Sequence, residues 1–268
     1  MKTETFSLPD GGVLTWYEAG RGRPLVLLHG WGSSASAFSE LVTMLADDFR
    51  LLVPDLPGHG ASSPALQNDL VNISASLNCW LMAIENTPVA LGGWSLGGML
   101  ALEMARQKPL TIDRLLLIAT TPRFTSGDDW TCGLPAVQVR ALARNLTRRF
   151  EATLADFFNL AFAGEDLSRQ RLRDIRNFAV KRSCLPEPTV ALELLHVLSG
   201  QNQLGFLSQI EQPALVMHGD LDQITPVEAG RYLADTLPRG VLMEFAGVGH
   251  GPFLSRPQDV VDKIMEFC

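Results

Sequence analysis

One short segment of this sequence can hold a reactive side chain, the Gly-x-Ser-x-Gly pattern at residues 93–97. An apolar run typical of a buried strand precedes it, and a helical pattern begins at Leu96. A serine in such a strand–turn–helix elbow lies at the top of a sheet with its hydroxyl exposed. Glycine is needed on both sides because a Cβ at Gly93 or Gly97 would collide where strand and helix approach closely. The segment therefore predicts Ser95 as a nucleophile for acyl transfer.

Two later loops supply the partners that a reactive serine needs, a base within hydrogen-bond reach and a group that orients the base. His250 and Asp222 each follow an apolar run typical of a buried strand. We expect His250 to take the Ser95 proton and later to protonate the leaving group, while Asp222 holds the imidazole in the required tautomer. Asp220 lies only two residues from Asp222, so it is the alternative candidate for the acid.

The tetrahedral intermediate of acyl transfer also needs hydrogen-bond donors for its negative oxygen. One donor is expected from the backbone N–H after the nucleophile, which belongs to Leu96. The other is expected from the loop after an earlier strand, where the sequence has His29-Gly30-Trp31-Gly32. We therefore predict an oxyanion hole formed by the N–H groups of Trp31 and Leu96, with His29 bracing the loop. The Trp31 indole either walls the acyl pocket or serves only in packing.

The elements that must position these side chains alternate between strands and helices along the chain. Two short alternating runs near the start predict a hairpin, and the later apolar runs are continuous, as in strands covered on both faces. Strands that alternate with helices imply an α/β fold with a mostly parallel, doubly wound sheet. In such sheets reactive groups collect at the carboxyl ends of the strands, where His29 and Ser95 fall.

The alternation of strands and helices stops between residues 122 and 204 and resumes after them. Within this stretch the apolar spacing predicts helices over three segments, 137–146, 150–162 and 167–180. We interpret residues 122–204 as a helical lid insertion above the sheet. Residues 1–121 and 205–268 then form the core of one catalytic domain.

Composition excludes several other classes of protein. The chain has 268 residues, of which 46% are hydrophobic, and a net charge of −7, which argues against binding nucleic acid through its phosphates. It has no run of 18 apolar residues and no apolar segment of a signal peptide, so we expect no membrane association and a cytoplasmic location. Four widely spaced cysteines and the lack of a ligand-spaced His/Asp/Glu cluster predict no metal and no disulfide framework. We expect a monomer without a cofactor.

Basic side chains gather in one part of the insertion. Residues 140–182 hold ten arginines and lysines against five acidic residues, a local net charge of +5. This stretch is either a solvated helical face or a docking surface for an acidic partner. Both interpretations stay open at this level.

The motifs together resemble those of the α/β-hydrolase superfamily, and the resemblance spans nearly the whole chain. It rests on five segments, which are residues 29–32, 55–60, 93–98, 221–226 and 250–253. They are most similar to the pimeloyl-[acyl-carrier protein] methyl ester carboxylesterases of biotin synthesis. The resemblance implies the α/β-hydrolase fold and hydrolysis of the methyl ester of a pimeloyl chain on acyl carrier protein, with release of methanol. The Gly-x-x-Asp-x-x-x-Pro spacing of the superfamily favours Asp222 over Asp220 as the acid.

The resemblance also implies a set of substrate contacts. They fall on Trp31 in the loop after the early strand, and on Phe157, Phe158 and Ala161 in the insertion. We therefore expect these four residues to bind a small ester substrate. Its acyl chain is carried on acyl carrier protein in the family that the sequence resembles.

Arginines in the lid of that family hold the acidic carrier. Arg169 and Arg173 align with such positions, and we expect them to bind the partner. The sequence departs from the family at Ala152 and Asp156, which fall where the family has basic residues. A carrier protein as partner is therefore an expectation that rests on the resemblance.

Two other functions remain compatible with the same motifs. A C–C bond hydrolase or a generic short-chain esterase would use the same serine, histidine and aspartate. A receptor with a hydrolase fold would bind a small molecule without turning it over. Labelling of Ser95 by a fluorophosphonate probe separates the receptor from the enzymes, and a diketone substrate separates the C–C hydrolase from the esterases.

Overall fold

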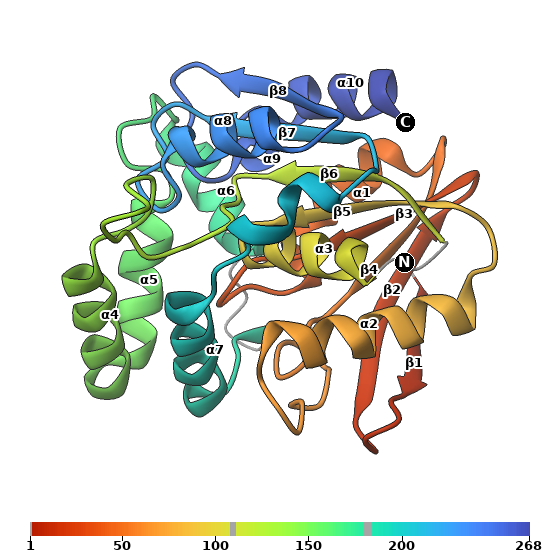
Figure 1. The fold of residues 1–268 in the computed structure, drawn as a ribbon, viewed down its shortest axis with the longest axis horizontal. Helices are drawn as coiled ribbons and strands as arrows, with labels where there is room; N and C mark the ends of the chain where they lie inside the picture. The colour runs from red at the N-terminus through yellow and green to blue at the C-terminus, as the bar shows by residue number, and fades with distance from the viewer. Residues whose placement is uncertain (1, 108–110, 180–183) are drawn as a thin grey trace.

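An eight-stranded sheet runs through the centre of the computed structural model, which describes residues 2–107, 111–179 and 184–268 (Figure 1). Its strands, in chain order within the described residues, are β1 (Lys2–Ser7), β2 (Val13–Gly20), β3 (Arg23–Leu28), β4 (Phe49–Pro54), β5 (Val89–Trp94), β6 (Ile112–Ile118), β7 (Ala214–Gly219) and β8 (Gly240–Phe245). The spatial order is β1-β2-β4-β3-β5-β6-β7-β8. Pairing is antiparallel between β1 and β2 and between β2 and β4, and parallel in every other pair. The predicted hairpin and the mostly parallel sheet are both confirmed.

The register of the central strands brings two predicted site loops together. Strand β3 pairs with β5 so that Leu28 lies opposite Gly93, and both strands end within two residues of that pair. Every residue of β5 is buried, as expected for a strand covered on both faces. The loop after β3 and the turn after β5 therefore leave the sheet side by side.

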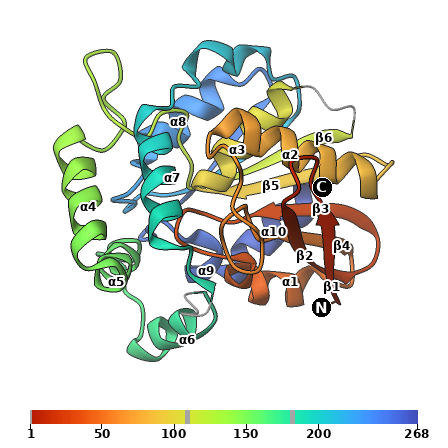
Figure 2. The same cartoon turned by 90° about the horizontal axis from the view of Figure 1, so that it is seen from below.

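Helices cover both faces of the sheet, as the doubly wound fold requires (Figures 1 and 2). One face carries α2 (Leu70–Ile84), α3 (Leu96–Arg106) and α8 (Val227–Thr236). The other carries α1 (Ser39–Leu45), α9 (Pro252–Ser255) and α10 (Pro257–Phe267). Helix α2 begins where Asp69 caps it, because the Asp69 carboxylate accepts the Asn72 N–H at 2.9 Å.

Four further helices lie between β6 and β7 in the chain and gather at one end of the sheet (Figures 1 and 2). They are α4 (Ala136–Arg148), α5 (Phe150–Leu160), α6 (Arg169–Ala179) and α7 (Pro188–Gly200). We call residues 122–204 the helical insertion. The structure contains helices in all three predicted segments, although Val180, the last residue of the third, is outside the described residues.

Helix α7 was not predicted. Its buried residues follow the spacing of one helical face, and they are Val190, Ala191, Leu194, Leu195 and Leu198. That spacing, with Pro188 at the first helical turn, is the sequence signal that could have found the helix.

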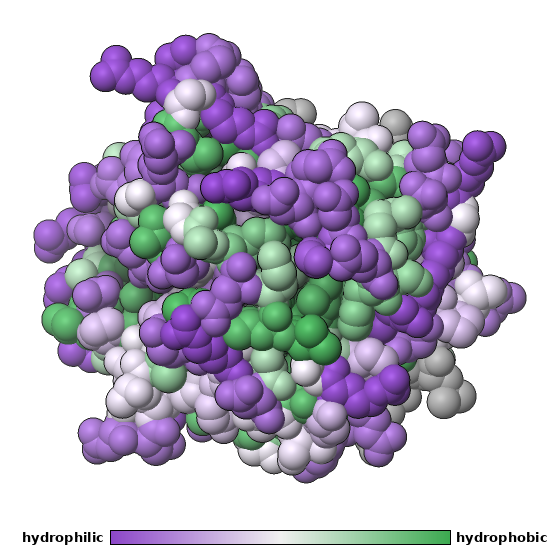
Figure 3. Space-filling view, turned by 90° about the horizontal axis from the view of Figure 1, so that it is seen from above, coloured by the Kyte–Doolittle hydropathy of each residue, from purple (hydrophilic) through white to green (hydrophobic). Residues whose placement is uncertain are grey.

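One edge of the sheet exposes apolar side chains. Figure 3 looks onto the side that carries α8, β8 and α10, where hydrophobic residues gather near the centre within a hydrophilic rim. Val241 of β8 and Met265 of α10 are both exposed. In the described part of the chain, no helix combines the length and apolar character needed to cross a membrane.

Candidate active site

The turn after β5 holds Ser95 in a strained backbone conformation. Its φ of 55° and ψ of −116° lie in a region that non-glycine residues rarely adopt, as in a nucleophile elbow. A Cβ on Gly93 would lie 2.1 Å from the carbonyl oxygen of Gly97, and a Cβ on Gly97 would lie 2.1 Å from that of Leu28. The predicted steric reason for both glycines is therefore confirmed.

The backbone around Ser95 is held by the neighbouring strand. The Ser95 N–H donates to the carbonyl of Ile118 at 3.0 Å, and the Thr120 hydroxyl donates to the Ser95 carbonyl at 2.7 Å. The same Thr120 side chain would meet a Cβ on Gly98 at 2.5 Å. Because strand, turn and helix touch through backbone atoms, the serine has little freedom to move.

Asp222 and His250 lie in contact at the carboxyl ends of β7 and β8. Asp222 Oδ2 accepts a hydrogen bond from His250 Nδ1 at 2.7 Å, which leaves Nε2 as the free nitrogen of the imidazole. Both side chains are buried. Burial alone would raise the pKa of Asp222, but the charge of His250 and hydrogen bonds from His218 and His250 outweigh burial and hold that pKa well below its usual value.

Asp220 takes part in a different interaction. Its Oδ1 accepts the backbone N–H of Gly247 at 2.7 Å, and it contacts the N–H of Val248 at 3.4 Å. It therefore braces the turn before His250 from an exposed position. Of the two aspartates left open by the sequence, the structure brings Asp222 to the imidazole.

Asp222 is fixed by donors that the sequence analysis did not identify. Its Oδ1 accepts the N–H groups of Ile224 and Thr225 at 2.8 and 2.9 Å, and its Oδ2 accepts the Thr225 hydroxyl at 2.8 Å. His218, fully buried, places Nε2 3.2 Å from the same Oδ2 and 2.6 Å from the Thr225 carbonyl. His218 is therefore a second histidine in contact with this carboxylate.

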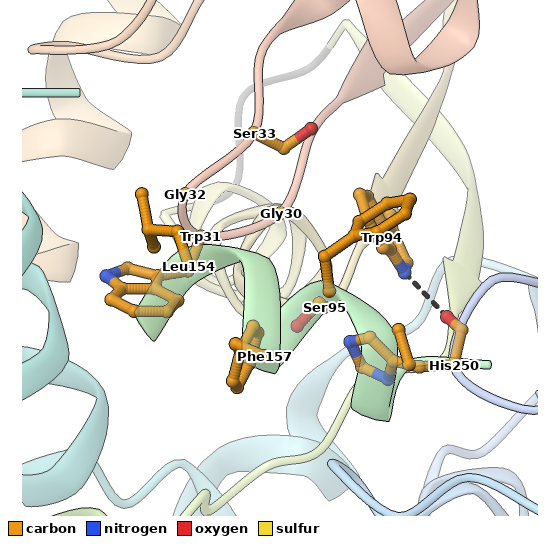
Figure 4. Close-up of a pocket in the computed structure, with 11 residues that line it drawn as sticks. Gly30, Trp31, Gly32, Ser33, Trp94, Ser95, Leu154, Phe157 and His250 are labelled. Carbon is orange, nitrogen blue, oxygen red and sulfur yellow. Dashed lines mark hydrogen bonds between the residues drawn. The ribbon is translucent and has the colours of Figure 1, made fainter. Parts of the chain in front are cut away.

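Ser95 and His250 line one cavity, into which both side chains project (Figure 4). The empty space of this cavity, counted together with its mouth open to solvent, is about 470 Å³. Its other walls come from the loop after β3 and from the helical insertion. All four predicted substrate-binding residues line it, and these are Trp31, Phe157, Phe158 and Ala161.

Hydrogen bonds of His29 and Trp31 hold the loop after β3 in place. His29 Nε2 accepts the Leu56 N–H at 2.9 Å while Nδ1 donates to the Gly30 carbonyl at 2.9 Å. Burial lowers the pKa of His29 to about 4, so the imidazole is neutral at pH 7. The Trp31 indole donates to the Ala191 carbonyl of α7 at 2.9 Å, and its ring meets Phe157 edge-on at 5.0 Å. The indole therefore both packs and forms a cavity wall.

The predicted oxyanion donors belong to two segments that adjoin Ser95, the start of α3 and the loop after β3. Leu96 is the first residue of α3, so its N–H has no acceptor within the helix. A Cβ on Gly30 would lie 3.3 Å from the Ser95 Cβ, which shows how closely the loop of Trp31 approaches the serine. A helix N-terminus also favours negative charge at this point.

Trp94 was missed as a residue that positions the histidine. It occupies the variable position before Ser95, and its indole N–H donates to the His250 carbonyl at 2.7 Å (Figure 4). Its ring also packs 5.6 Å from the His250 ring. An aromatic residue at that position is the signal that the sequence analysis passed over.

Arg169 and Arg173 both lie on α6 and are exposed, with Arg173 bonded to Gln170. Arg171 between them instead joins the insertion to the core, because its guanidinium binds the Glu40 carboxylate at 2.6 and 3.0 Å and the Leu254 carbonyl. Lys181 and Arg182 of the basic stretch lie outside the described residues. No group of three or more potential metal ligands occurs within the ranges described.

The fold and the elbow define the class of protein. The profile of the α/β hydrolase fold family matches residues 23–257, so the chain belongs to the α/β-hydrolase fold family. An esterase from Exiguobacterium antarcticum has the same fold, with a TM-score of 0.91 at 23% identity over 98% of each chain.

More similar sequences carry a more particular name. The chain is 36% identical over 247 residues to the pimeloyl-[acyl-carrier protein] methyl ester esterase of Chromobacterium violaceum, covering 92% of this chain and 94% of the relative. It is 33% identical over 252 residues to the protein of the same name from Nitrosospira multiformis, covering 93% and 95%. The predicted resemblance to this group of esterases is confirmed.

Proposed function

We propose that the protein is a serine carboxylesterase that hydrolyses the methyl ester of a pimeloyl chain carried on acyl carrier protein, a step of biotin synthesis. The observation that carries this proposal is the cavity shared by Ser95 and His250, with Asp222 bonded to the far side of the imidazole. The similarity to named methyl ester esterases over more than nine-tenths of the chain supports the choice of substrate.

In the proposed mechanism His250 Nε2 accepts the proton of the Ser95 hydroxyl as its oxygen attacks the ester carbonyl. The N–H groups of Trp31 and Leu96 hold the negative oxygen of the tetrahedral intermediate. His250 then gives its proton to the departing methoxide, which leaves as methanol, and Ser95 remains acylated. Water repeats the sequence, losing a proton to His250, and the free acid leaves as His250 returns that proton to Ser95. Asp222 stabilises the imidazolium in both halves.

We propose that the helical insertion acts as a lid over this chemistry. Leu154, Phe157, Phe158 and Ala161 supply its wall of the cavity, and this apolar wall suits the methylene chain of a pimeloyl group. The exposed Arg169 and Arg173 would meet the acidic carrier outside. A cytoplasmic monomer remains our prediction.

Replacement of Ser95 by alanine tests the esterase assignment. We expect wild type to hydrolyse short p-nitrophenyl esters and pimeloyl-carrier methyl ester, and Ser95→Ala to lose at least about 10³-fold in kcat. A fluorophosphonate probe should label wild type and leave Ser95→Ala unlabelled. Wild type that resists the probe would instead support a non-catalytic receptor.

Genetic complementation tests the substrate. A strain that lacks its biotin-pathway methyl esterase should grow without biotin when it carries the wild-type gene, and should not grow with Ser95→Ala. Growth with neither gene, together with vigorous hydrolysis of p-nitrophenyl esters, would make the protein a short-chain esterase of another pathway.

A further inference from the structure

The junction between α5 and α6, residues 161–165, is bonded to both loops that carry His250 and Asp222. The Ala161 carbonyl accepts the His250 N–H at 2.8 Å. The Gln223 side chain donates to the Ala163 carbonyl at 3.4 Å, next to Asp222. This junction of the insertion therefore touches the core at the two segments on which the proposed chemistry depends.

Glu165 makes the one side-chain bond from this junction to the histidine loop that the described residues show. Its Oε1 accepts the Gly249 N–H at 2.8 Å, immediately before His250 in the chain. The carboxylate is partly withdrawn from water, and burial raises the pKa of Glu165 above its usual value. A carboxylate that is partly shielded from water makes a stronger hydrogen bond to a backbone N–H than a fully exposed carboxylate does.

The approach between the two segments is close. A Cβ on Gly249 would lie 2.3 Å from the Ala161 carbonyl oxygen and 2.9 Å from Glu165 Oε1, so only glycine fits between them. On the other side of the loop, the Trp94 indole holds the His250 carbonyl at 2.7 Å. The backbone of His250 is thus held between the elbow and the helical insertion.

We propose that Glu165 is a positioning residue for His250, which fixes the histidine loop to the insertion through the Gly249 N–H. The proposal rests on the proposed function, in which His250 is the base. Loss of the Glu165 carboxylate should then lower the rate of proton transfer and leave the apolar cavity unchanged.

Two substitutions of Glu165 and one control test this role. Glu165→Ala removes the acceptor, Glu165→Gln keeps an oxygen at the same place, and Asp166→Ala removes a neighbouring, exposed acid. With a p-nitrophenyl ester we expect Glu165→Ala to lower kcat about tenfold with KM within about twofold, because the base is misplaced while binding is not. Glu165→Gln should recover most of kcat, and Asp166→Ala should match wild type.

Hydrogen exchange gives a measure that does not depend on activity. The Gly249 amide should exchange about tenfold faster in Glu165→Ala than in wild type, and near the wild-type rate in Glu165→Gln. Should Glu165→Ala fail to fold, Glu165→Asp takes its place, since it draws the carboxylate back by one methylene.

The outcomes separate the two proposals. An unchanged kcat with unchanged exchange at Gly249, a loss confined to KM, or a Gln variant as poor as the Ala variant would each overturn the role of Glu165. Wild type without esterase activity, together with faster exchange in Glu165→Ala, would overturn the proposed function and leave the structural link intact.

Discussion

The elbow that carries Ser95 and the helical insertion above it are held in place in different ways. In the elbow, backbone meets backbone, and a Cβ on Gly93 or Gly97 would fall 2.1 Å from a carbonyl oxygen. Away from the junction at residues 161–165, side chains also attach the insertion to the core, such as Arg171 on Glu40 and the Trp31 indole on the Ala191 carbonyl. Its outer helices α4 and α6 keep many charged residues exposed.

The two kinds of contact suit two different roles, holding the reaction geometry and presenting a surface to the substrate. Contacts between backbone atoms leave no room for variation, so they suit the geometry of a reaction that must be held within fractions of an ångström. Contacts through side chains can be replaced one at a time, so they suit a surface that selects a substrate. The junction at residues 161–165 is where the two regions meet.

The largest loss of activity is expected from a change at Asp222, which bonds the imidazole nitrogen of His250 that faces away from Ser95. Asp222→Asn should lower kcat/KM by about 10³- to 10⁴-fold, because the amide no longer holds the His250 tautomer that can accept a proton. Asp220→Asn, which changes only a brace of the turn, should stay within about threefold of wild type. Steady-state kinetics on one ester decides, and the reverse ranking would give the acid role to Asp220.

Matched glycine substitutions test the contrast between elbow and insertion. Gly97→Ala should lower the free energy of unfolding by more than about 3 kcal/mol, since its Cβ has only backbone to displace. Gly164→Ala, at φ +88° in the insertion with the nearest atom 3.6 Å away, should cost about 1 to 2 kcal/mol of backbone strain. Urea unfolding measures both. Equal losses would show that the elbow is no more tightly packed than the insertion.

Buried histidines of the core should make stability depend on pH. Burial lowers the pKa of His29 to about 4 and that of His59 to about 3, against 6.5 for an ordinary histidine. Their stabilising effect is therefore complete above pH 6.5 and falls as the pH drops from about 6.5 towards 4, because the unfolded chain takes up the protons first. Each histidine contributes up to about 1.4 kcal/mol per pH unit in this window.

Unfolding by urea between pH 7 and 4.5 measures this slope. His59→Gln should flatten it, whereas His196→Gln, an exposed position on α7 of the insertion, should leave it unchanged. A slope that survives His59→Gln in full would mean that groups elsewhere dominate the acid lability. The lowered pKa of Asp222 adds little to this slope, because the stability that it contributes is lost mainly as the pH falls below 3.8, the ordinary pKa of an aspartate.

The smallest loss of activity is expected from changes to the exposed arginines of α6. Arg169→Glu and Arg173→Glu should lower kcat/KM for the carrier-linked ester by up to about tenfold at low salt and leave p-nitrophenyl ester hydrolysis unchanged. Arg21→Glu makes the same charge change on an exposed loop of the core and should have no effect on either substrate. Equal losses for all three variants would point to net charge rather than a docking surface.

Much of the fold could be predicted because its signals are local. Continuous apolar runs predict the central strands, and the glycines around Ser95 predict the elbow, since both depend on neighbours in the chain. Helix α7 was not predicted although its apolar spacing is regular.

By itself the sequence determined the α/β class, and it predicted Ser95 as the nucleophile and the order of its partners, because hydrophobic period and glycine sterics act over a few residues. Only the tertiary structure showed that Asp222 contacts the His250 imidazole while Asp220 bonds the turn before it, and only it revealed the contacts of Trp94, His218 and Glu165. The Glu165–Gly249 bond joins residues 84 positions apart. Such contacts depend on how the insertion packs on the sheet, and no local pattern in the chain encodes that packing.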